Sequence, residues 1–409
     1  MLSRLEELIE TLCPDGVEYV SMKDIKEESF WLMPATPNYI SDGIPYITSK
    51  NVKNGVIDFT NVKYISQDDF DIISANRKIE KNDLLITMIG TIGEAAFVNE
   101  QRDFYGQNMY LIRLDEKKVD RYYFYYFVTS LKIKSSLLSK KNASSQGYIK
   151  AGSLENLLLP LPPLKIQREI VRVLDNFTEL TSELTSELTA RKKQYEYYRD
   201  DLLAFDGKNV EWKRLEDIST DMYRGAGIKR DQVTEEGIPC VRYGEIYTAY
   251  DISFKECKSH TNEKEIHSKK YFEYGDILFT ITGESVEEIA KSIAYLGDDK
   301  CLAGGDIVVL KHNQNPRYLS YALSTTNAQM QKSKGKVKSK VVHSSVPALK
   351  EILVPIPSLE EQERIANILD NFHDLCNDIS EGIPAEIEAR QKQYEYYRDK
   401  LLTFKELGA

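Results

Sequence analysis

Hydrophobic residues recur with two different periods along this chain. In two long stretches they form short β-branched and aromatic runs that are broken by Gly, Asn and Asp, a pattern that predicts strands. The clearest runs cover residues 44–48, 84–88, 110–114, 277–282 and 307–310. Helical patterns lie near residues 121–132 and 316–331. We therefore expect two compact, mixed α/β domains, here called arm 1 and arm 2, in an α+β protein.

After each arm the apolar residues recur every three or four positions, which is typical of an amphipathic helix. A single helix over residues 163–205 would be about 65 Å long at about 1.5 Å per residue, more than a globular core needs. We expect the two long helices to pack antiparallel as a coiled-coil spacer with pseudo-twofold symmetry. The expected apolar stripes are Ile170, Val173, Phe177, Leu180, Leu184, Leu188, Tyr195, Tyr198, Leu202 and Phe205, and Ile365, Ile368, Phe372, Leu375, Ile379, Ile387, Tyr394, Tyr397, Leu401 and Phe404.

The chain is an internal duplication. The string KQYEYYRD occurs from Lys193 to Asp200 and again from Lys392 to Asp399. The string LDNF occurs from Leu174 to Phe177 and again from Leu369 to Phe372. Shorter matches in the arms follow in the same order, so we expect one design built twice. The expected domains are arm 1 over 1–160 with a short helix over 1–15, a helical spacer over 161–207, arm 2 over 208–355 and a second helical region over 356–409.

The two helical copies differ in two places. Gly382 and Pro384 both interrupt helices, so we expect a break in the second copy and a restart at Pro384. The first copy contains the tandem tetrapeptide TSEL, at Thr181 to Leu184 and at Thr185 to Leu188. By itself this repeat can be a plain helical stripe that happens to repeat.

Charge is distributed unevenly. The net charge of −10 at first argues against a nucleic-acid partner, because phosphate binding needs clustered Lys and Arg. However, residues 20–150 hold 18 basic against 16 acidic residues, and residues 213–350 hold 21 against 19, so both arms are slightly positive. The arms could therefore meet DNA, whereas the acidic helices suit protein partners.

Motifs for catalysis and metal binding are missing from the sequence. It has no P-loop, no GxGxxG after a strand, no HExxH and no GxSxG. Asn315-Pro316-Arg317-Tyr318 only partly resembles an amino-methyltransferase signature, and we interpret it as a helix start with Pro316 at the first position. The five cysteines and five histidines lack ligand spacing, so we expect no disulfide framework, no metal site and a reducing, cytoplasmic location. No apolar run reaches the roughly 20 residues that would span a bilayer.

Polar, basic and aromatic residues in the expected loops are the candidates for DNA contact, with Lys and Arg for phosphates and Asn, Gln and Arg for base edges. In arm 1 they are Thr48, Ser49, Lys50, Asn51, Gln107, Asn108, Lys140, Lys141, Gln146, Tyr148 and Lys150. In arm 2 they are Arg224, Lys229, Arg230, Arg242, Tyr243 and the alternating lysines Lys332, Lys334, Lys336, Lys338 and Lys340. Each could instead be an ordinary solvated loop residue. On the helices, Tyr197, Arg199, Tyr396 and Arg398 are candidates for docking a partner.

The phrases PLPPLKIQREI from Pro160 and PIPSLEEQERI from Pro355, each followed by LDNF and a KQYEYYRD helix, resemble the specificity subunits of type I restriction-modification systems. The resemblance covers essentially the whole chain. It implies that the arms are target recognition domains, which read the two halves of a split and asymmetric double-stranded DNA site. It also implies that the helices hold two methyltransferase subunits and recruit the restriction and translocase subunits. The tandem TSEL unit resembles the short repeats by which members of this family vary the length of the spacer. The chain itself would then be non-catalytic and bind no cofactor, with S-adenosylmethionine, ATP and Mg²⁺ on its partners.

Two other functions remain open from the sequence. One is a coiled-coil adaptor whose arms bind protein, which the acidic total charge would suit. The other is a stand-alone DNA-modifying enzyme, which the missing motifs disfavour.

Overall fold

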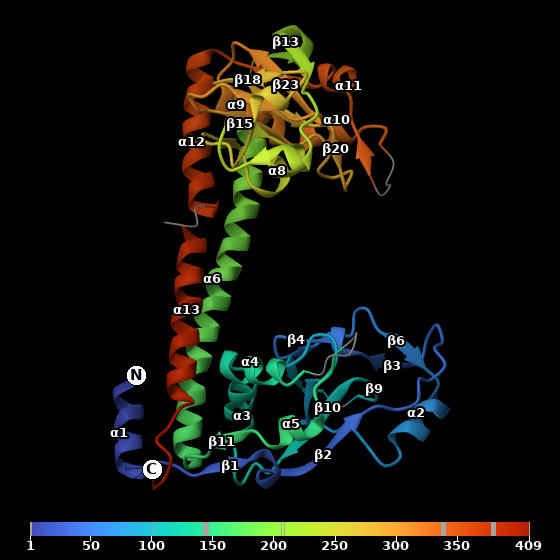
Figure 1. Cartoon of the computed structure of the whole chain (residues 1–409), viewed down its shortest axis with the longest axis vertical. Helices are drawn as coiled ribbons and strands as arrows, with labels where there is room; N and C mark the ends of the chain where they lie inside the picture. The colour runs from blue at the N-terminus through green and yellow to red at the C-terminus, as the bar shows by residue number, and fades with distance from the viewer. Residues whose placement is uncertain are drawn as a thin grey trace. The chain divides into compact units, whose positions relative to one another are not determined.

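A computed structural model describes residues 2–100, 102–141, 147–205, 207, 209–336, 341–377 and 382–408. The chain divides into two compact units. Unit 1 comprises Met1–Leu184 and Ile387–Ala409, and unit 2 comprises Thr185–Glu386. Each unit therefore holds one arm, part of the first long helix and part of the second helical region (Figure 1).

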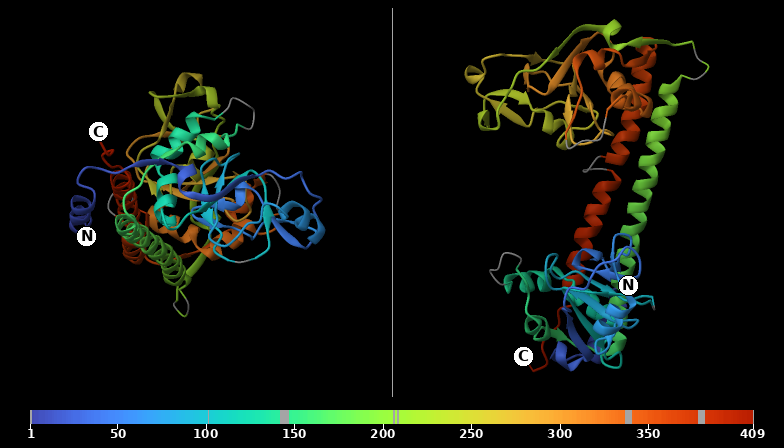
Figure 2. Two further views of the ribbon diagram at one scale, coloured as in Figure 1. Left: turned by 90° about the horizontal axis from the view of Figure 1, so that it is seen from below. Right: turned by 90° about the vertical axis from the view of Figure 1, so that its right-hand side faces the viewer.

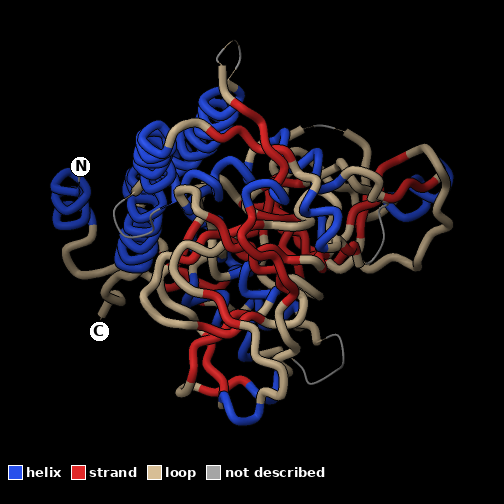
Figure 3. The backbone as a smooth tube through the Cα atoms, turned by 90° about the horizontal axis from the view of Figure 1, so that it is seen from above, coloured by secondary structure: helices blue, strands red, loops and turns tan. Residues whose placement is uncertain are grey.

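Like arm 2, arm 1 contains many short strands joined by loops, and Figure 3 shows such strands in red and the loops in tan. Its main sheet has four antiparallel strands in the order β2-β10-β7-β8, and a second sheet has the order β6-β3-β9. The strands of unit 1 are β1 Tyr19–Ser21, β2 Lys26–Leu32, β3 Ile44–Ile47, β4 Val52–Lys53, β5 Val56–Ile57, β6 Lys63–Ile65, β7 Leu84–Thr87, β8 Ala95–Phe97, β9 Tyr105–Gly106, β10 Met109–Leu114 and β11 Leu158–Pro160. Its helices include α1 Leu2–Leu12, η1 Met22–Asp24, η2 Ser49–Asn51, α2 Gln67–Ser74, α3 Arg121–Val128, α4 Leu131–Ser139 and α5 Ala151–Glu155.

Arm 2 repeats this plan with additions. Its main sheet has the order β13-β23-β19-β21-β16, and a second five-stranded sheet has the order β14-β17-β15-β22-β18. The strands are β12 Glu211–Arg214, β13 Ser219–Arg224, β14 Val233–Thr234, β15 Ile238–Val241, β16 Ser253–Phe254, β17 Ser259–Thr261, β18 Tyr271–Phe272, β19 Ile277–Thr280, β20 Thr282–Gly283, β21 Ser292–Tyr295, β22 Cys301–Ala303, β23 Ile307–His312, β24 Val342–His343 and β25 Leu353–Ile356. The helices are α7 Leu215–Ile218, η3 Arg230–Gln232, α8 Tyr243–Thr248, η4 Glu263–Glu265, α9 Pro316–Ser324, α10 Thr326–Ser333 and α11 Val346–Lys350.

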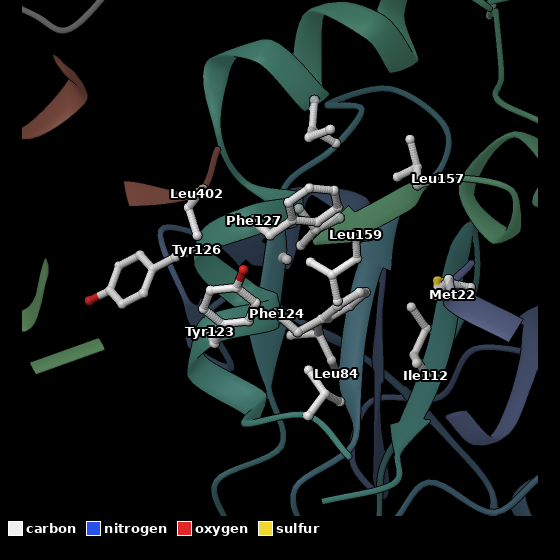
Figure 4. Close-up of a cluster of buried hydrophobic side chains, with 14 of the residues drawn as sticks. Met22, Leu84, Ile112, Tyr123, Phe124, Tyr126, Phe127, Leu157, Leu159 and Leu402 are labelled. Atoms are coloured by element: carbon white, nitrogen blue, oxygen red, sulfur yellow. The ribbon is translucent and has the colours of Figure 1, made fainter. Parts of the chain in front are cut away.

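The core of unit 1 lies between the main sheet, α3 and the long helices. Figure 4 shows Tyr123, Phe124 and Phe127 of α3 packed with Leu84 of β7 and with Leu159. Because aromatic residues bury large areas, this layer supplies much of the hydrophobic stabilisation of the arm.

The five strand runs and both helical stretches that the sequence predicted are present. The start of α9 at Pro316, capped by the Asn315 side chain, is also as expected. Each expected arm helix is followed by a second one, α4 or α10, that begins at a Ser or Thr cap.

Each unit contains an antiparallel helix pair that joins one copy of the repeat to the other. The long helix is α6 Leu164–Ala204, and the second helical region consists of α12 Leu359–Asn377 and α13 Ile383–Leu401. In unit 1 α13 lies alongside α6 (Figure 1), and the ring of Phe177 stacks on that of Tyr397 of α13 at 5.4 Å between centroids. In unit 2 α12 lies alongside the end of α6 (Figure 2), and the ring centroids of Phe372 of α12 and Tyr198 of α6 are 5.8 Å apart. The LDNF phrase of each copy thus packs against the KQYEYYRD phrase of the other.

The expected interruption of the second helix is confirmed, since α12 ends at Asn377 and α13 begins at Ile383, one residue before Pro384. The expected stripe is wrong at three of the described positions. Leu180, its repeat partner Leu375 and Tyr198 are exposed, because the neighbouring helix does not cover the stripe fully at these points. The predicted Ile379 lies outside the described residues.

Candidate nucleic-acid interface

In arm 1 a depression of about 880 Å³ brings together six of the predicted residues from three separate segments. They are Thr48, Ser49, Lys50, Asn51, Asn108 and Lys141. Four further polar or aromatic residues that sequence reasoning missed also line the depression: Tyr46, Asp58, Asn61 and Lys63. Tyr46 lies on β3 and Lys63 on β6, whereas Asp58 and Asn61 lie between β5 and β6, and only the fold brings these four residues to the loops.

The side chain of Asn51 holds this loop together instead of facing outward. Its Oδ1 atom accepts from the Thr48 backbone N–H at 2.9 Å, and its Nδ2 donates to the carbonyls of Asp58 and Asn61. Only 8% of Asn51 is exposed. The expectation that Asn51 reads a base edge is therefore not supported, because its hydrogen-bonding groups are used in folding. The neighbouring Lys50 is left exposed at the rim.

Positive charge predominates around the depression. Lys50, Lys63 and Lys141 face one carboxylate, that of Asp58. Hydrogen bonds from the Thr60 hydroxyl and backbone hold the pKa of Asp58 below its ordinary value. Lys63 also lies 3.8 Å above the ring of Tyr39. A concave surface with several lysines and uncharged polar groups can bind a phosphate backbone and hydrogen-bond to bases.

The remaining arm 1 candidates lie around this depression or apart from it. Gln107 accepts a hydrogen bond from the hydroxyl of Tyr46 at 3.4 Å, which places it beside the lining. Lys140 and Lys150 are exposed, and Tyr148 packs against Trp31 at 6.1 Å between ring centroids. Gln146 lies outside the described residues.

In arm 2 a depression of about 560 Å³ brings Arg230, Arg242 and Tyr243 together. Arg242 pairs with Glu245 through Nη2, while its buried Nε has no hydrogen-bond partner in the described protein. Arg224 is anchored at the wall of the depression, where Nη2 lies 2.6 Å from Asp306. Lys229 caps the short helix η3 with its backbone.

The two depressions lie at equivalent places in the duplicated fold. Each lies directly after strand β3 or β15, at a short helix whose N-cap residue is Thr48 in arm 1 and Arg242 in arm 2. At this place arm 1 presents Ser-Lys-Asn, whereas arm 2 presents Tyr-Gly-Glu. The frame is therefore shared, and its chemistry has diverged.

The expectation that Lys332 lies in a loop and can contact DNA is wrong. This residue lies on the inner face of α10, only 4% exposed, and its ammonium donates to Ser292 Oγ at 3.1 Å and to the Leu323 carbonyl at 2.8 Å. The alternating pattern misleads because α10 continues through Ser333, so that the first lysine is helical. Lys334 is exposed and Lys336 is half-buried, whereas Lys338 and Lys340 lie outside the described residues.

The four docking candidates on the helices fall into two classes. Tyr197 and Tyr396 are 66% and 63% exposed, as expected for residues off the apolar stripe. Arg398 is instead buried against the ring of Tyr394, and Arg199 pairs with Asp200 at 2.8 Å. The two arginines therefore stabilise the helix pairs, and the expectation that they face a partner is not supported.

Within the described ranges, no three His, Cys, Asp or Glu residues lie close enough to hold a metal ion. None of the helices in those ranges combines the length and the apolar character that crossing a membrane requires.

Comparison with known proteins identifies the duplicated fold. The family model of the type I restriction modification DNA specificity domain matches the chain twice, over residues 14–191 and 208–389. A type I restriction enzyme specificity subunit of Escherichia coli is 33% identical over 299 residues, which are 71% of this chain and 72% of the relative. A protein of Haemophilus influenzae described as a candidate subunit of the same kind is 29% identical over 382 residues, 89% of each chain.

A solved structure from work on assembly and conformational transition of a type I restriction-modification system has the same fold. It superposes with a TM-score of 0.65 at 16% identity, covering 95% of this chain and 98% of that chain. Proteins of this family bind DNA and assemble with other restriction-modification subunits. The comparisons favour neither the adaptor nor the stand-alone enzyme. The chain belongs to the specificity subunits of type I restriction-modification systems, which are non-catalytic and carry two target recognition domains.

Proposed function

We propose that arm 1 and arm 2 each read one half of a bipartite, asymmetric DNA site through the two depressions. The observation that carries this is their equivalent position in the duplicated fold combined with their different lining. A shared frame would present both surfaces to DNA in the same way, while different side chains would select different bases. Lysines at the rims would neutralise phosphates without selecting a sequence.

Methylome mapping of a host that carries the chain with its partner subunits tests this assignment. The arm 1 variant Lys50→Ala/Asn108→Ala is expected to relax or abolish one half-site and to leave the other unchanged. The arm 2 variant Arg230→Ala/Tyr243→Ala is expected to act on the opposite half. Lys117→Ala, an exposed lysine of arm 1 outside the depression, serves as the control. Changes in both halves from one variant would contradict the assignment.

We further propose that the helices dock two methyltransferase subunits on two equivalent surfaces. Large apolar residues that are exposed to solvent recur as repeat partners: Leu158 with Leu353, Leu180 with Leu375, and Tyr197 with Tyr396. Apolar side chains that are exposed singly are common on protein surfaces, but their recurrence at matching positions of both copies is what two equivalent docking surfaces would leave. Each copy of the repeat thus keeps three exposed apolar residues at matching positions, which supports docking of two identical partner subunits.

Co-purification with the methyltransferase tests the docking surfaces. Tyr197→Ser and Tyr396→Ser are each expected to weaken one of two sites, and together both. Tyr274→Ser, which changes an equally exposed tyrosine of arm 2, is the matched control. A control that weakens binding as much would contradict the assignment. In this complex the restriction and translocase subunits join the methyltransferases in the cytoplasm, and S-adenosylmethionine, ATP and Mg²⁺ are bound by these partners.

A further inference from the structure

Arm 2 contains a buried lysine without a carboxylate partner. Lys332 has hydrogen bonds to Ser292 Oγ and to the Leu323 carbonyl, and neither acceptor carries a charge. Among the described residues no Asp or Glu forms an ion pair with it. Burial, together with repulsion from Arg199, lowers the pKa of Lys332 to about 7. A buried ammonium without a counter-ion is costly, so it calls for a physical reason.

The other half of the duplication shows that the fold does not require this lysine. Ser130 and Thr325 cap α4 and α10, and Leu137 of α4 occupies the place that Lys332 occupies on α10. Ser292 pairs with Phe279 across the main sheet, as Ala95 pairs with Ile86 in arm 1. Arm 1 therefore builds the same layer with a buried Leu and Ala. The polar pair is specific to arm 2.

Lys332 and Ser292 line a cavity of about 540 Å³ within unit 2. Three other cationic side chains from two elements line it: Lys192 and Arg199 of α6, and Lys291 before β21. Lys291 donates to the Tyr250 carbonyl at 2.9 Å, and burial lowers the pKa of its ammonium. The inner wall of the cavity thus holds more than one cation that water does not fully solvate.

The acidic groups of the cavity lie nearer to solvent. Glu196, Glu287 and Glu288 are exposed. The Asp251 carboxylate accepts a hydrogen bond from His373 Nε2 at 2.8 Å, so this carboxylate already has a cationic partner when His373 is protonated. This arrangement suits a small anion that reaches the buried cations. It disfavours a long polyanion, which the outer carboxylates would repel.

We propose that this cavity binds one small oxyanion of the phosphate or sulfate type, with Lys332 as its principal ligand. The anion supplies the charge that the buried ammonium lacks, and charge-assisted hydrogen bonds from Lys332 and a neighbouring cation hold it. It is either a free inorganic ion or the phosphate group of a small phosphomonoester. The site is separate from the depression of arm 2 and does not depend on the proposed half-site reading.

Calorimetric titration of the full chain with sulfate tests the site, because sulfate does not titrate near neutral pH. Ionic strength is held constant with chloride. We expect one saturable site, and we expect Lys332→Leu to lower the affinity roughly tenfold or more, the effect of losing a charge-assisted hydrogen bond. Lys334→Leu, which changes an exposed lysine two residues away, is expected to bind sulfate normally.

Proton uptake gives a second readout. Near pH 8 Lys332 is mostly neutral when the site is empty, since its pKa is about 7, so anion binding should take up a proton. The measured heat should then depend on the ionisation heat of the buffer. The other groups of the cavity, including His373, stay in place in Lys332→Leu. Loss of the buffer dependence in this variant therefore assigns the proton to Lys332.

The leucine variant is expected to fold, because arm 1 carries leucine at this place, and its melting temperature should equal or exceed that of the unmodified chain. Should it fail to fold, Lys291→Met replaces it as the affinity test. The proposed site would be overturned if the unmodified chain showed no saturable sulfate binding, or if Lys332→Leu bound sulfate as tightly as the unmodified chain. It would also be overturned if Lys332→Leu and Lys334→Leu lost the same amount of sulfate affinity. Tighter binding of glycerol phosphate than of sulfate and inorganic phosphate would identify a phosphomonoester, and the reverse order a free ion.

Discussion

At the scale of single residues, the duplication preserves interactions more faithfully than residue types. Asp83 pairs with Arg113 of β10, and at the equivalent place Asp276 pairs with Lys311 of β23, both at 2.9 Å. Burial raises the pKa of each carboxyl, and the facing cation opposes this rise. Both arms therefore keep a cation on the second strand of the main sheet, and this cation is Arg in one arm and Lys in the other.

Two repeat-related tyrosines should differ in how much they stabilise their units. Tyr126 donates to Asp175 at 2.6 Å, and Tyr321 donates to Asp370 at 2.7 Å. Asp370 also accepts from Arg317, so it keeps a partner when the tyrosine hydroxyl is removed. We expect Tyr126→Phe to lower the free energy of unfolding of unit 1 by about 1–2 kcal/mol and Tyr321→Phe to cost unit 2 less. Scanning calorimetry measures both, with the exposed Tyr122→Phe as control, and a larger loss in Tyr321→Phe would contradict the reasoning.

His373 should make the stability of unit 2 depend on pH. Burial lowers the pKa of its imidazole, but the hydrogen bond and charge of Asp251 outweigh burial and raise the pKa above its ordinary value. A raised pKa means that the folded state holds the proton more tightly, so the stabilisation is complete below about pH 6.5 and is lost as the pH rises through the raised value. We expect His373→Leu to lower the melting temperature more at about pH 6 than at about pH 9. A deficit that grows with pH would refute this sign.

At the scale of elements, one glutamine in each copy ties the start of a long helix to its arm. Gln167 of α6 accepts from the Asp120 backbone N–H at 2.8 Å and donates to the Pro162 carbonyl at 2.7 Å. Gln362 of α12 makes the equivalent bonds to Asn315 and Pro357, both at 2.9 Å. Both side chains are fully buried, so each glutamine fixes the loop before an arm helix onto the long helix.

Replacing either glutamine should therefore loosen an arm from its helix. Gln167→Leu and Gln362→Leu each leave buried backbone groups without partners, and we expect each to cost its own unit about 2–4 kcal/mol. Hydrogen exchange should show the loss confined to unit 1 in the first variant and to unit 2 in the second. Gln393→Leu, on an exposed face of α13, should change little. Equal loss of protection in both units from one variant would contradict separate anchors.

The sequence predicted the elements well because their signals are local. Strand runs, the Pro316 helix start and the break before Pro384 depend on residues adjacent in the chain. The antiparallel helix pairs could be expected because duplicated stripes need a partner. Side-chain direction in the arms could not be predicted, because Asn51 is satisfied by carbonyls 7 and 10 residues away. Likewise, whether a lysine lies inside or outside at the end of α10 depends on where that helix stops.

At the scale of the whole molecule, the duplication separates what is shared from what has diverged. Both copies retain the main sheet, the aromatic contacts between helices and the glutamine anchors, which are matters of folding and assembly. The short helices after β3 and β15 carry different side chains on the same frame. New specificity can therefore arise by substitution on one arm without loss of the fold or of the surfaces that the helices present.

Spacing between the half-sites should depend on the length of α6 and be independent of the arms. Residues 181–188 are helical throughout, and Ser182, Glu183, Ser186 and Glu187 are exposed, so removal of one TSEL unit leaves an uninterrupted helix. Deleting Thr181 to Leu184 shortens the helix by about 6 Å and changes its rotation by about 400°, which nearly preserves its apolar face. At about 3.4 Å per base pair, the unread gap should shorten by one or two base pairs.

Methylome mapping should show this shorter gap between two unchanged half-sites. Ser182→Ala/Ser186→Ala, which keeps the length, should leave the gap as it is, and altered half-sites in the deletion variant would show that α6 also shapes the reading surfaces.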